Sequence, residues 1–325
     1  MTTDSMFNRK AQKTIGPLLL LLSFSFLPFL LQGQSLKRFS YTHPQMGTRF
    51  RIVLYAESEN KAQHASELAF SHLDSLNQRL SDYIPESELN RLGRQSGTKK
   101  KLVVSKELWQ ILRQSKQLSK KSKGAFDVTI GPLSKLWRKA FKAREFPSAA
   151  AVLAAKKRVN YRYLKPSRSE HSVRLKKANM QLDLGGIAKG YAADEMMKIL
   201  AQEGITSALI DAGGDILLSG PPPEKDGWTI RIQDGETSKP LLLHHCAIAT
   251  SGDTYQFLSW EGKKYSHIID PRTGYGLTHR LQITVIAPTG SLADGLASTL
   301  SVLGQKKGQG WVKRFKDCSV TFVAQ

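Results

Sequence analysis

The sequence has little cysteine, and this shortage excludes two classes of protein. Only 2 cysteines occur in 325 residues, and neither stands in a CxxC pattern or among histidines. A disulfide-stapled scaffold and a cysteine-based zinc site are therefore excluded. Whether Cys246 and Cys318 pair in an oxidising compartment stays open at this point, and both are interpreted as structural residues.

Acidic residues are also in short supply. Asp and Glu total 27 against 48 Lys and Arg, which gives a formal net charge of +21. The simplest interpretation is a basic, solvated surface, and the sharper ones are an anionic substrate or an anionic lipid surface. No zinc-finger spacing, RNA-binding pattern or basic stripe with interleaved aromatics accompanies the charge, so nucleic acid ranks last among the partners and none is expected.

Long apolar runs are scarce except near the N-terminus. Basic residues precede an apolar run from Ile15 to Leu31, and polar and small residues follow it. This order is typical of a secretory signal peptide, which we place at residues 1–34, with a single domain over 35–325 and two subdomains as the alternative. Because the run is marginal for a membrane span, cleavage near 33–35 is expected over permanent anchoring. No cysteine follows the run, so the chain is not an obvious lipoprotein.

The most informative stretch reads MQLDLGGIAKGYAAD and occupies residues 180–194. Alternating apolar residues from Met180 to Leu184 predict a half-buried strand, which Gly185-Gly186 ends. From Ile187 the apolar spacing becomes helical, and Gly204 supplies a stop. The stretch therefore predicts a strand, a glycine turn and a helix.

This glycine turn is a candidate anion site. Asp183 would stand at the strand end and Lys189 in the first helical turn. Backbone N–H groups, the positive end of a helix and a lysine together suit a phosphate or pyrophosphate. The turn matches neither GxGxxG nor GxxxxGK[ST], and a purely structural turn is the alternative.

The flanking sequence predicts helices and strands in alternation. A strand from Arg49 to Ala56 leads to a long helix that Ser58 caps, and a second amphipathic helix spans about Ser105 to Ser122. Residues 124–133 are interpreted as a passage from loop to strand. A short alanine-rich helix is expected near 148–158. Further strands are predicted at 208–217 (with a glycine turn), 228–233, 240–249 and 281–287.

Two stretches near the C-terminus carry candidate chemistry. Residues 265–274 read YSHIIDPRTG and are predicted to close a strand; their histidine is either a core residue or, given the neighbouring Asp, Arg and Thr, a functional one. Ser291 is expected to cap a helix from Leu292 to Leu303. Asp294 and Ser298 are four residues apart on that helix, so their oxygens suit a hard cation such as Mg²⁺; the alternative is an aspartate that favours the helix dipole.

Together these stretches resemble the ApbE family of FAD:protein FMN transferases. No single motif is specific, but eight occur in the family's order over nearly all of the chain after the N-terminal run. They are MGT at 46–48, SxYxPxSEL at 81–89, FDVTIGPLxxLW at 126–137, LDLGGIAKGYAAD at 182–194, GGD at 213–215, ATSGD at 249–253, HIIDPRTG at 267–274, and AD in the last helix.

The resemblance implies a fold and a reaction. The fold is α+β, with mixed or antiparallel sheets flanked by helices in an ApbE-like, T-fold-related architecture. The reaction is Mg²⁺-dependent transfer of the FMN half of FAD to a threonine hydroxyl of an acceptor, with release of AMP. Acceptors of such enzymes are typically membrane redox-complex subunits that face the outside, so a periplasmic location or the outer face of the inner membrane is expected.

The resemblance also assigns roles near the pyrophosphate. Asp294, Ser298 and the carbonyl of Gly186 would bind the metal, and Lys189 would contact FAD beside Asp183. Pyrophosphate carries about two negative charges and its cleavage adds charge to AMP, so a metal and a lysine are the expected stabilisers.

The remaining roles concern the nucleotide and the proton. The resemblance places nucleotide contacts at Met46, Tyr83, Ala125, Phe126 and Asp127. His267, Ile268 and Asp270 would line the pocket at the reacting phosphate. His267, Asp294 and Lys189 are thus the catalytic candidates, with either His267 or a metal-bound Asp294 acting on the threonine hydroxyl.

The sequence departs from the family pattern at three points. Ser298 stands where threonine is common, Asp211 stands where asparagine is common, and the lipoprotein cysteine is missing. Two other functions therefore stay open beside the transferase: an FAD pyrophosphatase that yields FMN and AMP, and a secreted FAD-binding protein without turnover.

Overall fold

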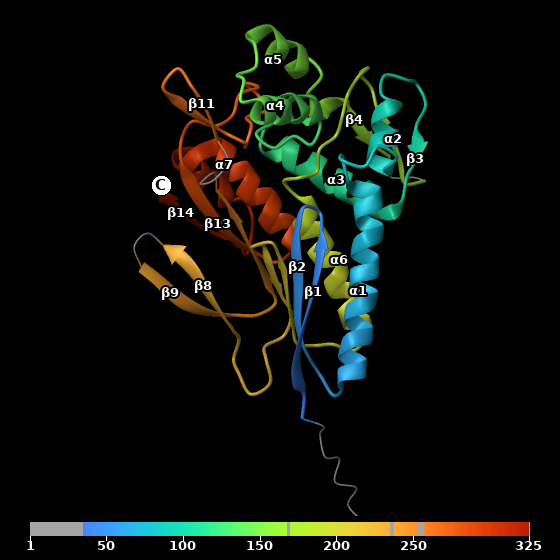
Figure 1. Cartoon of the computed structure of the whole chain (residues 1–325), viewed down its shortest axis with the longest axis vertical. Coiled ribbons are helices and arrows are strands. Elements are labelled where there is room, and N and C mark those ends of the chain that lie inside the picture. The colour runs from blue at the N-terminus through green and yellow to red at the C-terminus, as the bar shows by residue number, and fades with distance from the viewer. Residues whose placement is uncertain (1–34, 168–169, 235–236, 253–256, 325) are drawn as a thin grey trace, which may run out of the picture. The chain divides into compact units, whose positions relative to one another are not determined.

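A seven-stranded antiparallel sheet forms the centre of the fold in a computed structural model of the chain (Figure 1). The structure describes residues 35–167, 170–234, 237–252 and 257–324, so the signal peptide predicted at 1–34 lies outside the described residues. From Ser35 onward the chain forms one compact unit. No helix within the described ranges is long and apolar enough to cross a membrane.

The central sheet has the strand order β1-β2-β6-β7-β10-β13-β14, and each neighbouring pair is antiparallel. The sequence left open whether the sheets are mixed or antiparallel, and the central sheet is antiparallel. The strands are β1 (Lys37–Gln45), β2 (Thr48–Ala56), β6 (Ala208–Ala212), β7 (Ile216–Leu218), β10 (Cys246–Ser251), β13 (Leu281–Ala287) and β14 (Ser319–Ala324).

Three long helices pack on the sheet: α1 (Glu59–Leu80), α6 (Ala188–Gln202) and α7 (Gly290–Val312). They contact β2, β6 and β10 with β13, respectively. Alternation along β2 sends Ile52 into the large core beneath these helices, whereas Val53 joins a smaller cluster on the opposite face. The predicted α+β class is confirmed.

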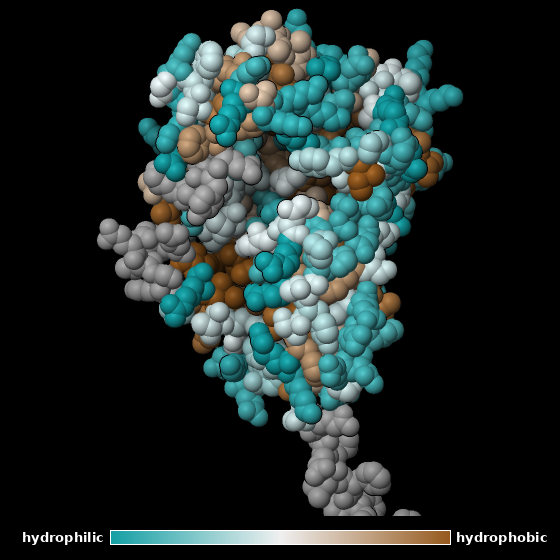
Figure 2. Space-filling model, in the orientation of Figure 1, coloured by the Kyte–Doolittle hydropathy of each residue, from teal (hydrophilic) through white to brown (hydrophobic). Residues whose placement is uncertain are grey.

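The opposite face of the sheet is covered by a separate ribbon of two strands, β8 (Trp228–Asp234) and β9 (Thr237–Leu243). Trp228 and Ile230 pack there against the sheet. Apolar surface remains visible beside this ribbon in Figure 2. The two faces of the sheet are therefore buried to different extents.

Smaller elements lie at the top of Figure 1, beyond one end of the central sheet. Helix α3 has the buried stripe that its sequence predicts, and Ser105 caps it by accepting the N–H of Leu108. These elements are α2 (Glu88–Arg94), α3 (Lys106–Lys121), α4 (Gly131–Ala143), α5 (Ala149–Lys156), the 3₁₀ turn Tyr161–Tyr163, the small sheet of β3 (Leu102–Val103), β5 (Ser172–Leu175) and β4 (Leu164–Pro166), and the hairpin of β11 (Phe257–Trp260) and β12 (Lys263–Ser266).

The strand predicted from Met180 to Leu184 is wrong, although the alternating burial is present. Met180, Leu182 and Leu184 are buried, but a single parallel bridge between Gln181 and Ile130 is the only ladder contact of this segment. The neighbouring segment turns into α4 directly after Ile130, so no strand continues beside it. The helix predicted after the glycine turn is confirmed as α6, with Lys189 in its first turn.

The strand interpretation of residues 124–133 is also wrong, because the segment turns and begins α4. The Asp127 carboxylate accepts both the N–H and the hydroxyl of Thr129, at 2.9 and 2.7 Å, which closes a tight turn. Pro132 then stands in the first turn of α4, where its missing N–H costs nothing.

Other boundaries differ by local backbone geometry. The strand predicted at 240–249 is broken at His245, whose φ is 49°, and its halves join different sheets. Thr289 caps α7 instead of Ser291, and α7 continues beyond a kink at Gly304, where φ is 71°. Cys246 and Cys318 are both free, so the open question of their pairing is answered by two separate thiols.

Candidate active site

A cavity of about 820 Å³ lies between α4, the glycine turn before α6, β10, α7 and the loop after β12. Its volume is within the range of about 300–1,000 Å³ that is typical of small-molecule sites. In Figure 2 the surface is hollowed below the region of α4 and α5. The predicted site residues that line it are Tyr83, Ala125, Phe126, Asp127, Asp183, Gly186, Lys189, His267, Ile268, Asp294 and Ser298.

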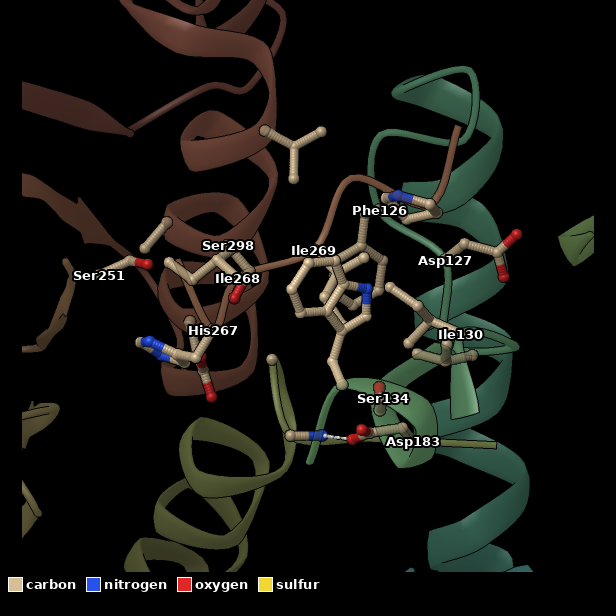
Figure 3. A pocket seen from close by; sticks show the side chains of 18 of the residues that line it. Phe126, Asp127, Ile130, Ser134, Asp183, Ser251, His267, Ile268, Ile269 and Ser298 are labelled. Atoms are coloured by element: carbon tan, nitrogen blue, oxygen red, sulfur yellow. Dashed lines mark hydrogen bonds between the residues drawn. The ribbon is translucent and has the colours of Figure 1, made fainter. Parts of the chain in front are cut away.

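The cavity is built from segments that are far apart in the sequence. Figure 3 shows Ser251, His267 and Ser298 on one side and Ile130 and Ser134 on the other. Helices α4 and α7 supply the two walls, and the hairpin of β11 and β12 leads into the loop that carries His267. The fold thus unites motifs that the sequence only showed in order.

Two predicted residues do not line the cavity. Met46 lies in the turn between β1 and β2, with a φ of 51°, and packs against the large core, so its contact with FAD stays a prediction. Asp270 is buried, and its carboxylate accepts the guanidinium of Arg272 at 2.8 Å. Asp270 is not among the residues that line the cavity, so its place at the reacting phosphate stays a prediction.

The first charged group of the cavity centres on Lys189. Its Nζ lies 2.7 Å from Oδ2 of Asp215, and Oδ1 of Asp215 accepts the N–H of Thr250 at 3.2 Å. Burial lowers the pKa of Lys189, but the carboxylates of Asp215 and Asp294 raise it more, so the net shift is upward. Lys189 is therefore a fixed positive charge at neutral pH.

Asp294 is the most strongly perturbed carboxyl of the cavity. It is 6% exposed, and its Oδ2 accepts the N–H of Gly190 at 3.2 Å. Burial and the nearby Asp215 raise the pKa of Asp294 to about 7, although Lys189 opposes the shift. Two carboxylates around one ammonium leave this end of the cavity with a deficit of positive charge.

The backbone of the glycine turn lies against the side chain of Ser298. A Cβ added to Gly186 would lie 2.7 Å from Oγ of Ser298, closer than real Cβ atoms approach a neighbour. Glycine is therefore required at 186 for the turn to reach α7. This contact brings Gly186, Ser298 and the adjacent Asp294 into one place, as the predicted metal site requires.

The first turns of α6 and α7 are locked together beneath this end. A Cβ on Gly190 would lie 2.1 Å from the carbonyl oxygen of Gly290, so the two backbones touch. Asp194 of α6 accepts the N–H groups of Gly290 and Ser291 at 2.6 and 2.9 Å and thereby caps α7. Asp294 and Ser298, two of the predicted metal ligands, thus stand on a helix that is fixed against α6.

The donor set fits a hard cation of modest affinity. Within the described part of the chain, no group of three or more His, Cys, Asp or Glu side chains is arranged to hold a metal. One buried carboxylate, one hydroxyl and one backbone segment remain, and oxygen donors of this kind suit Mg²⁺, which keeps several waters. The deficit of positive charge around Asp294 favours such an ion.

Some of the backbone N–H groups that were predicted to bind a phosphate at the glycine turn already donate hydrogen bonds to other groups of the protein. The N–H groups of Ile187 and Ala188 donate to the carbonyl of Leu184 at 3.0 and 2.8 Å. The N–H of Gly190 donates to Asp294. At these positions the helix start binds the protein's own acceptors, so an anion there would depend on Lys189 and a metal more than on these backbone N–H groups.

A second charged group lies at the other end of the cavity and centres on Arg138. Its guanidinium bridges Asp82 and Asp183, with Nη2 2.8 Å from Oδ2 of Asp183. Tyr83 is 73% exposed, and the Arg138 guanidinium lies 4.3 Å from its ring centroid. Burial and the neighbouring Asp183 raise the pKa of Asp82, and Arg138 opposes that shift.

Asp127 has a different position from the one expected. Its carboxylate is buried and also accepts the N–H of Tyr161 at 2.8 Å. In Figure 3 this carboxylate points away from His267 and Ser298. Asp127 therefore lines the cavity while its carboxylate organises the loop, and contact with a nucleotide would fall to its neighbours Ala125 and Phe126.

Arg138 and Asp215 were not selected from the sequence as site residues. Asp215 ends the GGD motif, so a signal for it was present. Arg138 follows the LW pair without any motif of its own, and its role depends on α4 being a helix. Ser134, Arg138 and Lys142 are four residues apart on α4 and all line the cavity, a spacing that only the helical interpretation makes visible.

The fold and site define an α+β protein with a cavity that brings together an exposed aromatic ring, part-buried cations and several carboxylates. The ApbE family model matches residues 46–322, and the chain belongs to the ApbE family. Two curated relatives are FAD:protein FMN transferases. That of Treponema pallidum (strain Nichols) is 32% identical over 307 residues, covering 88% of this chain and 84% of the relative. That of Escherichia coli (strain K12) is 32% identical over 279 residues, covering 83% and 79%.

Solved structures are similar over most of the chain. The apo form of the flavinyl transferase ApbE from Pseudomonas stutzeri aligns with a TM-score of 0.80 and 28% identity, covering 90% of this chain and 92% of that one. The flavin transferase ApbE from Vibrio cholerae aligns with a TM-score of 0.75 and 27% identity, covering 89% and 94%.

Proposed function

We propose that this protein transfers the FMN moiety of FAD to a threonine hydroxyl of an acceptor protein and releases AMP. One observation carries the proposal: residues expected to contact FAD and a metal come from separate motifs, yet they line one cavity of about 820 Å³. The names of the curated relatives, FAD:protein FMN transferase, support the same reaction.

The reaction replaces the phosphoanhydride bond of the pyrophosphate with a phosphoester bond to the acceptor. The acceptor oxygen attacks the phosphorus on the FMN side of the pyrophosphate, the bond from that phosphorus to the bridging oxygen breaks, and AMP leaves with the electron pair. The hydroxyl proton passes to a base. Positioning and stabilisation of charge are the main demands of such a transfer.

Asp294, Ser298 and the backbone of Gly186 would hold Mg²⁺. Bound there, the ion would draw charge from the pyrophosphate oxygens. Lys189 is kept protonated by Asp215 and Asp294, so its ammonium would stabilise the negative charge that develops on AMP. Asp215 positions that ammonium through the 2.7 Å contact.

His267 is the proposed base. It lines the cavity and its side chain is exposed, so an acceptor from outside can reach it. An imidazole exchanges protons near neutral pH, as deprotonation of a hydroxyl requires. The alternative is that a metal-bound Asp294 orients the hydroxyl; a His267→Gln variant with normal FAD binding and unchanged turnover would favour that alternative.

The other end of the cavity would hold the rings of the dinucleotide. Tyr83 offers an exposed aromatic face, which Arg138 supports from one side. Ala125, Phe126 and Ile268 supply an apolar wall, and Ile268 packs against the cluster that contains Ala125. Asp183 would accept hydrogen bonds from the nucleotide.

We also propose that the protein is exported and acts on a membrane redox-complex subunit at the outer face of the inner membrane. The N-terminal pattern of residues 1–34 supports export, and the net charge of +21 supports attraction to an anionic membrane surface. Two measurements test this: detection of the shortened protein in the periplasmic fraction, and salt-sensitive binding to vesicles with anionic lipid. Retention of full-length protein in the cytoplasm would contradict export.

The transferase itself is tested with purified residues 35–325, FAD, Mg²⁺ and a soluble flavoprotein-subunit domain that carries a flavinylation threonine. A denaturing gel reports covalent flavin fluorescence, and AMP is measured alongside. The expected result is a fluorescent acceptor band with an equal amount of AMP, abolished by EDTA. AMP without a band would indicate the pyrophosphatase, and tightly bound FAD without AMP would indicate the binding protein.

A further inference from the structure

The hairpin of β11 and β12 has one covered edge and one open edge. Ser266 donates its N–H to Leu277 at 2.8 Å, and Leu277 donates to Ile268 at 2.9 Å, so the outer edge of β12 is covered. Within the described ranges, no backbone hydrogen bond reaches the outer edge of β11. An open edge is a template for a further extended chain.

The turn of the hairpin fixes which backbone groups face outward. Glu261 and Gly262 both have positive φ, 46° and 72°, as a type I′ turn requires. The turn makes Trp260 and Lys263 a hydrogen-bonded pair, and hydrogen-bonded pairs alternate along an antiparallel ladder. The backbone groups of Phe257 and Ser259 therefore point away from β12.

The two faces of the hairpin have different roles. Leu258 is buried, and Trp260 stacks on Phe146 with ring centroids 5.2 Å apart while it stays 45% exposed, so this face packs on the protein mainly through Leu258. On the other face Phe257 is 40% exposed, with Nζ of Lys264 4.6 Å from its ring centroid. The packed face holds β11 in place while its outer edge and charged face stay accessible.

The open edge begins at the mouth of the cavity. Phe257 lines the cavity, as does His267. Phe257 is also the register partner of Ser266, the residue directly before His267. A chain added to β11 would run about 4.8 Å from it, and its end at Phe257 would therefore reach the cavity beside His267.

We infer that the outer edge of β11 docks an extended, acidic segment of the acceptor protein and delivers its hydroxyl to the cavity. The inference rests on the proposed function, which requires a protein substrate at this mouth. Backbone hydrogen bonds to Phe257 and Ser259 would supply affinity, as in other recognition by strand addition. Exposed Lys264, whose Nζ lies over the ring of Phe257 on the accessible face, favours an acidic partner.

A proline at Ser259 tests the docking directly. The N–H of Ser259 faces outward, so Ser259→Pro removes a docking donor without removing a hydrogen bond of the hairpin, a position where strands tolerate proline. The expected result is a rise in the KM for the flavoprotein-subunit domain of about tenfold, with kcat at saturating acceptor and the Kd for FAD unchanged. Ser259→Ala is the matched control and should behave as the wild type. An unchanged acceptor KM in Ser259→Pro would overturn the inference.

A charge reversal gives a second, independent reading. Lys264→Glu leaves the backbone intact and should raise the acceptor KM severalfold at low salt, with a smaller effect at high salt. Lys99→Glu, on an exposed segment that does not line the cavity, is the control. If Ser259→Pro also weakens FAD binding, the Lys264→Glu result decides: a raised KM supports docking and an unchanged one overturns it. Absence of transfer by the wild type would instead overturn the proposed function and this inference with it.

Discussion

The two ends of the cavity differ in how their charged groups are held. At the Asp294 end, Asp294 and Asp215 are buried, Lys189 is part-buried, and the backbones of α6 and α7 touch at Gly190 and Gly290. At the Tyr83 end, an exposed ring and a half-buried Arg138 rest on the surface of α4. The first arrangement holds atoms in fixed positions, and the second is open to an incoming ligand.

This difference indicates a division of labour. Groups that stabilise a transition state act best when they are preorganised and shielded from water, as at the Asp294 end. Groups that recognise a nucleotide need accessible faces and hydrogen-bonding partners, as at the Tyr83 end. Substitutions at the first end should therefore lower turnover, and substitutions at the second should weaken FAD binding.

The largest effect is expected for Asp294→Asn. The variant keeps the size of the side chain but removes the carboxylate proposed to hold Mg²⁺, so turnover should fall by about a thousandfold and lose its response to Mg²⁺. Initial rates of acceptor flavinylation over a range of Mg²⁺ concentrations measure this. Ser298→Thr keeps its hydroxyl and is the control that should stay active. Full Mg²⁺-dependent activity in Asp294→Asn would contradict the proposed binding of Mg²⁺ by Asp294.

The next largest effect is expected for Gly186→Ala. Because the new Cβ would lie 2.7 Å from Oγ and 3.2 Å from Cβ of Ser298, either the Ser298 hydroxyl must rotate away or the turn must shift from α7, and both displace a predicted metal ligand. A displacement of about 1 Å at a reacting centre costs about a hundredfold in rate, while FAD binding at the other end should change little. Gly310→Ala, whose Cβ would meet nothing within 4 Å, is the control. Equal losses of rate in both variants would contradict a specific contact at Gly186.

Arg138→Met should affect the Tyr83 end of the cavity and therefore FAD binding. It removes the bridge between Asp82 and Asp183 and the support of Tyr83, so the Kd for FAD should rise about tenfold, with kcat at saturating FAD largely kept. Quenching of flavin fluorescence on titration measures the Kd. Arg138→Lys keeps the charge but loses the two-sided bridge, so it should lie between the wild type and Arg138→Met. A large loss of kcat in Arg138→Met would contradict separate roles for the two ends of the cavity.

The smallest effect is a pH dependence of metal binding. Asp294 has a pKa of about 7 in the folded protein, above its ordinary value, so the metal-free fold binds this proton more tightly than the unfolded chain. Its contribution to stability is therefore lost as pH rises through 7, and Mg²⁺, which needs the carboxylate, should restore it. Apparent Mg²⁺ affinity should weaken about tenfold from pH 8 to pH 6. Thermal unfolding with Mg²⁺ or EDTA at each pH measures this, and a Mg²⁺ shift in Tm that does not grow with pH would contradict it.

Elements with strong periodicity were predictable from the sequence. Ser58 does cap α1, accepting the N–H of Lys61, and the alanine and leucine stripe of that helix is fully buried. The strand Leu281–Ala287 has the predicted bounds. In these elements the local sequence pattern agrees with the packing in the fold, so they could be predicted without knowing which distant residues they contact.

Elements whose conformation depends on a distant contact were not predictable. The buried alternation of residues 180–184 is the same for a strand and for an extended segment without a ladder partner, and only the turn at Asp127 decides between them. Arg138 gained its place through the helix that this turn begins.

The affinity for FAD, measured without metal by flavin fluorescence for Asp294→Asn and Arg138→Met side by side, tests the division of labour most directly. If the two ends have separate roles, Asp294→Asn binds FAD as the wild type does, and Arg138→Met binds it about tenfold more weakly. The reverse order, with FAD binding lost in Asp294→Asn and kept in Arg138→Met, would contradict the account.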